Sequence, residues 1–133
     1  MQDLKPEIFS RLKALMAHYV GRMKVVKNDE KTYELVLIKN FTMNGKKMDS
    51  LYFATAIIQK NFVGFYFFPI YTHPAAFAGM PVELRKMLKG KSCFHVKKWD
   101  EATESNLEAL IMQGYELYSE IKEGTLMDLR QSN

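Results

Sequence analysis

The chain has 133 residues, of which 47% are hydrophobic, and a formal net charge of +4. This length suits one domain over residues 1–133 with a single core. The one cysteine, Cys93, excludes an internal disulfide, and no apolar run approaches the ~20 residues needed to span a bilayer. The first residues lack the basic-then-apolar order of a signal peptide. We therefore expect a cytoplasmic protein that does not engage membranes.

The charges are unevenly distributed. Residues 1–98 hold 17 Lys and Arg against 7 Asp and Glu, whereas residues 99–133 hold 2 against 8. A basic surface attracts anions and nucleic acid. However, no more than two Lys or Arg residues are adjacent, which favours a simpler role for the charges in solubility and in docking of the two segments. Nucleic acid is therefore not the expected partner.

The first predicted element is an amphipathic helix over residues 5–20. Apolar residues recur there at helical spacing, namely Ile8, Leu12, Leu15, Met16 and Tyr19. Asp3 is a candidate N-cap, and Gly21 is expected to end the helix.

Four strands are predicted next, over residues 23–27, 32–41, 48–58 and 61–68, because turn residues separate these apolar segments. Asn44 and Gly45, between the second and third, are the strongest hairpin signal in the chain, since both tolerate a positive φ. The connections are too short for parallel crossovers, so the strands should form an antiparallel meander.

The C-terminal half begins where Pro69 ends the fourth strand. We expect a loop over residues 70–80, a short helix over 81–88, a last strand over 92–97 and a long helix over 100–122. The long helix should bury an apolar stripe, made of Leu107, Leu110, Ile111, Gly114, Tyr118 and Ile121. Two long helices flanking a meander predict an α+β two-layer sandwich, with both helices packed on one face of the sheet.

The fourth strand is apolar on both of its faces. Val63, Phe65 and Phe67 point one way, whereas Phe62, Tyr66 and Phe68 point the other way, although a sheet with one covered face should alternate apolar with polar residues. The second face is therefore a homodimer seam, a site for an apolar or aromatic ligand, or a surface covered by residues 70–77. The residues of this candidate ligand or dimer face are Tyr52, Phe62, Tyr66 and Phe68.

Three other groups have ordinary structural interpretations. Cys93 and His95 share a face of one strand, but a metal needs further ligands and a nucleophile needs an aligned, oriented base. We interpret them as a half-buried cysteine beside a hydrogen-bonded histidine. His73 is expected to be a turn residue ahead of proline, and His18 to lie on the exposed side of the first helix.

The last helix carries carboxylates about one turn apart. Glu101, Glu104 and Glu108 are the candidate metal residues, because paired carboxylates hold hard cations. The alternative is a solvated helix face whose first carboxylates complement the helix dipole. The sequence contains no nucleotide-binding loop, nucleophile elbow, HExxH or CxxC motif, so we do not expect an enzyme.

The segment that starts at the fourth strand resembles a known family. Val63-Gly64-Phe65-Tyr66 is followed by Pro69, a short helix over residues 84–89, Lys91-Ser92 and Phe94. This order resembles the YdhG-like family of domains of unknown function (the family numbered 1801), across most of the chain from the first helix to Glu123. The resemblance implies a frataxin-like architecture and, as in some relatives, an iron chaperone for iron–sulfur or haem assembly.

The resemblance thus makes iron the one possible cofactor. Frataxins carry their carboxylates on the first helix and first strand, whereas this chain has four basic residues there against Glu7 alone: Lys5, Arg11, Lys13 and Arg22. No iron-binding residue is therefore carried over. The expected function is a small non-catalytic protein, such as a frataxin-like iron-binding chaperone. The alternative is a ligand-binding or homodimerisation module that uses the aromatic face.

Overall fold

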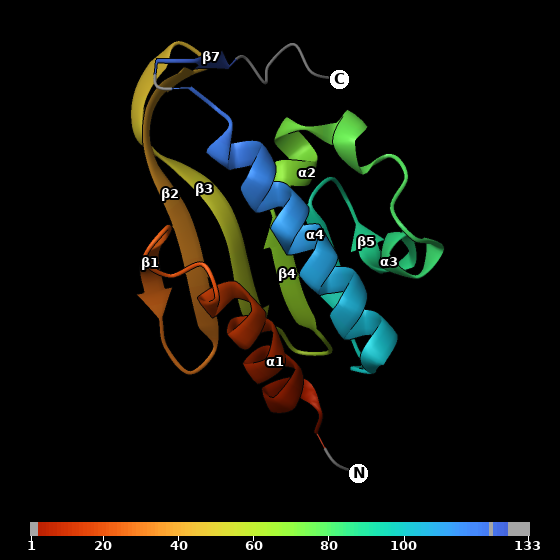
Figure 1. Cartoon of the computed structure of the whole chain (residues 1–133). Coiled ribbons are helices and arrows are strands. Elements are labelled where there is room, and N and C mark those ends of the chain that lie inside the picture. The colour runs from red at the N-terminus through yellow and green to blue at the C-terminus, as the bar shows by residue number, and fades with distance from the viewer. Residues whose placement is uncertain (1–2, 123, 128–133) are drawn as a thin grey trace.

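The computed structural model describes residues 3–122 and 124–127. Figure 1 shows helices α1 and α4 lying across the same face of one sheet, which confirms the predicted α+β two-layer sandwich. None of the described helices is long and apolar enough to cross a membrane. In chain order the elements are α1 (Lys5–Ala17), β1 (Lys24–Asn28), β2 (Thr32–Met43), β3 (Lys46–Ile58), β4 (Val63–Phe67), α2 (Pro69–Thr72), the 3-10 helix η1 (Pro74–Phe77), α3 (Val82–Met87), β5 (Leu88–Lys89), β6 (Cys93–Val96), α4 (Glu101–Ser119) and β7 (Leu126–Met127).

The sheet has the strand order β1-β2-β3-β4-β6-β5, and neighbours in this order are antiparallel. The first four strands form the predicted meander. The chain then leaves the sheet through α2, η1 and α3 and returns as β5 and β6, so that β6 lies beside β4. The short β7 pairs with β2 in parallel. Both β5 and β7 have two residues, too few for an alternating pattern to predict them.

The predicted hairpin between β2 and β3 is confirmed. Asn44 and Gly45 form the turn with φ of 52° and 85°, the positive values that a two-residue hairpin requires. The pairing continues to Met43 and Lys46. The two strands are therefore longer at this end than the sequence pattern indicated.

A bulge in β3 sets the direction of its side chains. The pairing with β2 shifts register at Phe53, so that Phe53 and the following Ala54 both face the core and are fully buried. Bulges re-aim side chains in this way. The consequence is that Tyr52 and Thr55, three residues apart, lie on the opposite face of the sheet.

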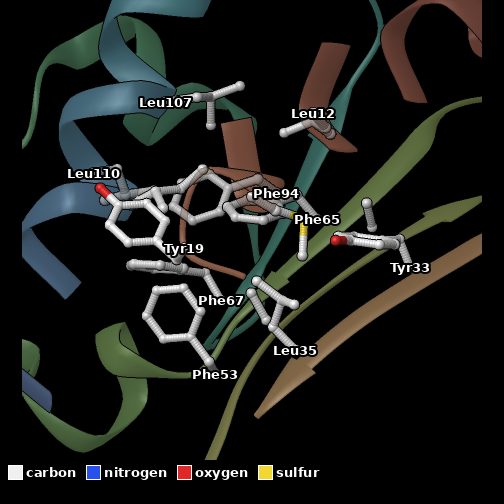
Figure 2. Close-up of a cluster of buried hydrophobic side chains, with 14 of the residues drawn as sticks. Leu12, Tyr19, Tyr33, Leu35, Phe53, Phe65, Phe67, Phe94, Leu107 and Leu110 are labelled. Carbon is white, nitrogen blue, oxygen red and sulfur yellow. The ribbon is translucent and has the colours of Figure 1, made fainter. Parts of the chain in front are cut away.

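The hydrophobic core lies between the sheet and the helices (Figure 2). Phe67 lies near its centre, with ring centroids 5.5 Å from Phe53 and from Phe65. Burying each such ring contributes roughly 1.5–3 kcal/mol. The helices contribute the predicted stripes, which consist of Ile8, Leu12 and Met16 from α1 and Leu107, Leu110, Ile111, Gly114 and Tyr118 from α4.

Both ends of α4 are held by side chains. Asp100 is the N-cap, and its Oδ1 accepts a hydrogen bond from the Thr103 backbone N–H at 2.7 Å. At the other end, Lys39 from β2 donates to the carbonyls of Tyr118 and Ile121. A cation at this end also complements the helix dipole. The helix ends at Ser119, three residues before the predicted boundary.

Helix α1 differs from its prediction at both ends. Asp3 does accept a hydrogen bond from the Lys5 N–H at 3.0 Å, but Leu4 occupies the N-cap position without a side-chain bond. The helix ends at Ala17, and Tyr19 is buried in the turn that follows. Gly21, at φ 102°, lies in this turn and not directly at the helix end.

Residues 70–80 contain α2 and η1, where a loop was expected. Phe77 is buried with its ring 5.7 Å from Phe67, and the side chain of Gln113 in α4 donates to the Ala76 carbonyl at 2.7 Å. The segment therefore packs on the helical side of the sheet. The alternative in which residues 70–77 cover the second face is wrong, apart from Tyr71, whose ring lies 5.5 Å from Phe68.

Gly114 brings α4 close to the sheet and to α2. A Cβ at this position would lie 2.4 Å from Phe67 Cζ and 3.0 Å from Pro69 Cγ. The Phe67 ring is surrounded by other core rings and has little room to move. A larger side chain at position 114 must therefore push the helix away from the sheet.

We predict that Gly114→Ala lowers the free energy of unfolding by about 1–3 kcal/mol, because overpacking outweighs the better helix propensity of alanine. Urea denaturation measures this change. Glu116→Ala, at an exposed position of the same helix, should stay within about 0.5 kcal/mol of the parent. A stability gain in Gly114→Ala would contradict the close approach.

Candidate functional site

The face of the sheet that points away from α1 and α4 is the candidate site, and we call it the open face. The buried residues of the described helices join one core on the other side, so these helices leave the open face without a second layer. Tyr66 and Ile38 on this face are 37% and 59% exposed. The strand pairings and the adjoining rings assign to the open face Lys24, Lys27, Glu34, Val36, Ile38, Tyr52, Thr55, Ile57, Phe62, Gly64, Tyr66, Phe68, Lys89, Cys93 and His95.

One row of directly opposed residues crosses the entire open face. Directly opposed residues of antiparallel strands point to the same side. At about 4.8 Å between strands, the row is roughly 24 Å long and has a lysine at each end. Its members in spatial order are Lys27, Glu34, Thr55, Tyr66, Cys93 and Lys89.

The four aromatic residues predicted for this face all lie on it, but they do not form one cluster. Tyr52 and Phe68 contact each other, with ring centroids 5.5 Å apart. Phe62 lies at the other end of β4, and Tyr66 lies between the two groups. The rings of Phe62 and Tyr66 both lie over Gly64, where a Cβ would be 3.5 Å and 3.4 Å from them.

Two ring-bearing residues of the open face were not among the predicted site residues. His95 stacks on Phe62, with ring centroids 3.7 Å apart and planes 11° apart. Tyr71 extends the other group through its contact with Phe68, and the ammonium of Lys91 lies 5.6 Å from its ring. The alternation of β6 placed His95 on one face with Cys93, but the sequence did not indicate that β6 would lie beside β4.

A chain of hydrogen bonds fixes Tyr52 on the open face. The Thr55 hydroxyl donates to Glu34 Oε1 at 3.0 Å. Because its single hydrogen is used there, the Tyr52 hydroxyl donates to Thr55 Oγ1, at 2.5 Å. Burial raises the pKa of Tyr52 to about 12. The phenol is therefore a neutral donor at neutral pH.

The prediction that Cys93 is half-buried is confirmed. Burial raises the pKa of its thiol, so the thiolate that nucleophilic chemistry requires is disfavoured. The adjacent His95 contacts the Phe62 ring face to face. These two residues contribute surface to the open face.

His73 and His18 lie away from the open face. Burial lowers the pKa of His73, whose Nδ1 is 2.8 Å from the Thr72 hydroxyl. That hydroxyl also lies 3.2 Å from the buried Tyr118 hydroxyl, so this network joins α2 to α4. His18 follows α1 and lines a cleft of about 380 Å³ between α1 and α4.

The three candidate metal residues lie on α4, on the helical side. Glu104 Oε1 accepts a hydrogen bond from Trp99 Nε1 at 3.0 Å and lies 3.9 Å from Arg11. Within residues 3–122 and 124–127, the His, Cys, Asp and Glu side chains do not gather in any group of three that could hold a metal ion. Glu101, Glu104 and Glu108 therefore do not form the predicted site.

The charges of the molecule are separated between the two sides of the sheet. Helix α4 carries four Glu and no Lys or Arg. On the open face, Glu34 is the single acid among the described residues that the strand pairings place there, whereas Lys24, Lys27 and Lys89 are exposed. None of these three lysines forms an ion pair with a described residue.

A groove continues the open face around the edge of the sheet. It has a volume of about 390 Å³ and lies between α3, the end of β6 and the first turns of α4. We call it the basic groove, because its charged lining residues are Lys86, Lys89, Lys97 and Lys98 against Glu83 and Asp100. His95 belongs to both surfaces, since it lines the basic groove and stacks on Phe62.

Comparisons of this chain with protein-family models, with curated proteins and with solved structures found no match.

We predict that Tyr52→Phe lowers the free energy of unfolding by about 1 kcal/mol at neutral pH, because Thr55 loses a donor. The parent protein should also lose stability between about pH 10 and pH 12, where the unfolded chain releases the phenol proton and the folded protein retains it. Chemical denaturation across this pH range measures both effects.

The matched control is Tyr66→Phe, which removes a phenol from the exposed part of the same face. It should leave the neutral stability within about 0.5 kcal/mol of the parent. If Tyr52→Phe keeps the full alkaline loss of stability, burial of the Tyr52 phenol is not its cause.

Proposed function

We propose that this protein is a non-catalytic binding protein whose open face takes an anionic partner with flat, unsaturated groups. The observation that carries the proposal is that rings and exposed lysines, which form no ion pair with a described residue, share the face that the described helices leave uncovered. Several aromatic side chains of this face stay partly exposed to water, so part of their free energy of burial is not gained. The net stability of a folded domain is small, so this loss is significant. Such an exposed patch marks a site of interaction.

The anionic character of the partner follows from the charge separation. The lysines of the open face lie at both ends of the row, and the carboxylates of α4 lie on the far side of the sheet. A negatively charged partner is thus drawn to the open face and repelled from the helical side.

Catalysis is not part of the proposal. The thiol of Cys93 has a raised pKa, and the Tyr52 hydroxyl is engaged by Thr55. These groups lack the paired nucleophile and oriented base that covalent chemistry needs.

An iron-binding chaperone, which the family resemblance implies, gains no support from the carboxylate geometry. The nearest described partners of Glu104 are a tryptophan N–H and an arginine. A homodimer that aligns the two rows across the open face is disfavoured by charge, because it places the lysines at the margins opposite one another.

Anilinonaphthalene sulfonate, an anion with a flat ring system, is a suitable probe of this proposal. NMR titration of the full chain should show chemical-shift changes centred on Tyr66, Phe68 and His95, while circular dichroism stays unchanged. Tyr66→Glu should weaken binding at least tenfold, because it places among the rings a carboxylate that repels the anionic probe. Met112→Glu, at a residue of α4 that is 50% exposed, is the matched control and should bind as the parent does.

Chemical-shift changes centred on the cleft between α1 and α4 would contradict the proposed function, as would equal binding by Tyr66→Glu. Light scattering on the same samples tests the homodimer. A stable dimer that Tyr66→Glu dissociates would show that the open face binds a second copy of the chain and not the proposed anionic partner.

A further inference from the structure

The open face and the basic groove together specify the chemistry of the partner more closely. We propose that this partner is single-stranded nucleic acid, whose bases stack on the rings of the open face and whose phosphates contact the lysines at its margins. This inference rests on the proposed function, since it names the partner of the same face.

The rings provide two stacking platforms with one ring between them. The first is the Phe62–His95 stack, and the second consists of Tyr52, Phe68 and Tyr71 in successive contact. Stacking of bases on aromatic side chains tolerates any sequence, because every base has a flat face. Unpaired bases are required, since a duplex keeps its base faces covered.

The lysines provide contacts for a backbone that crosses the sheet. Lys27 and Lys89 end the row of which Tyr66 is a member, and Lys91 lies over the Tyr71 ring. The sequence argued against nucleic acid, because no more than two Lys or Arg residues are adjacent in it. The strand pairing instead brings separate lysines of β1 and β5 to the two ends of the row that contains Tyr66.

The basic groove offers an exit path for the strand. His95 joins it to the open face, and Lys86, Lys97 and Lys98 line it beyond the edge of β6. A polyanion can thus continue from the rings into the groove, where four lysines outnumber Glu83 and Asp100, although Lys98 is paired with Asp100 at 3.5 Å. An acidic protein segment would use the lysines but not the rings. An anionic membrane would need rings that protrude, whereas Phe62 and Phe68 are half-buried against their neighbours.

Fluorescence anisotropy with labelled single strands of about 12 nucleotides, as DNA and as RNA, tests the inference at about 50 and 200 mM salt. We expect both strands to bind, and to bind more weakly at the higher salt. Tyr66→Ala should weaken binding roughly 5- to 150-fold through the loss of a stacked base, whereas Tyr66→Phe should retain it. A preference for RNA or for DNA would show which of the two is the partner, because the two differ in the 2′-hydroxyl.

The phosphate contacts of the lysines are tested separately, through the salt dependence of binding. Lys27→Gln and Lys89→Gln should each reduce the slope of log affinity against log salt by about 0.7, the value for one phosphate contact on a single strand. Lys122→Gln, an exposed lysine beyond α4, is the matched control and should leave the slope unchanged. Unchanged slopes in the two open-face variants would overturn the proposed phosphate contacts.

Three competitors complete the test, namely duplex DNA of equal length, polyglutamate, and vesicles of phosphatidylserine and phosphatidylcholine. Tighter binding to any of them than to the single strands would overturn the inference. Absence of single-strand binding at low salt would overturn it as well. If anilinonaphthalene sulfonate still binds the open face in that case, the proposed function stands, and if neither binds, both fall.

Discussion

The alternation of side chains along a strand, combined with a single helical layer, is the constraint on which this structure depends. Each strand sends every second residue to the core and the others to the opposite face. The helices α1 and α4 cover one of these faces and supply the apolar stripes that complete its core. The other face must therefore be stable in contact with water by itself.

The open face meets this requirement in two ways. Its central residues shield one another from water. The Tyr52 hydroxyl is hydrogen-bonded to Thr55, and the Phe62 ring stacks on His95. Its margins are charged, which keeps an apolar surface soluble and opposes pairing with a second copy. The same two features make a surface on which flat groups can stack and anionic groups can be neutralised. The stability of this face and the proposed binding therefore depend on the same residues.

Much of the fold could be predicted from the sequence, because local signals and tertiary structure agree there. Asn44 and Gly45 form the expected turn, and Phe94 and Val96 face the core as their alternation indicated. The fourth strand ends before Pro69 as expected, but Pro69 and Pro74 also begin helical turns where a loop was predicted. The aromatic half of the candidate site was predictable, but its cationic half was not. Lys27 and Lys89 join Tyr66 only through the pairing of strands that are distant in sequence.

We expect the face opposite the helices to be both exposed and positively charged in solution. Paramagnetic relaxation of side-chain NMR signals by an anionic and by a cationic nitroxide tests both properties in one measurement. The account predicts strong relaxation at Tyr66 and Ile38 and little at Phe65, with the anionic probe more effective than the cationic one at Tyr66. Equal protection of Tyr66 and Phe65, or a stronger effect of the cationic probe at Tyr66, would contradict it.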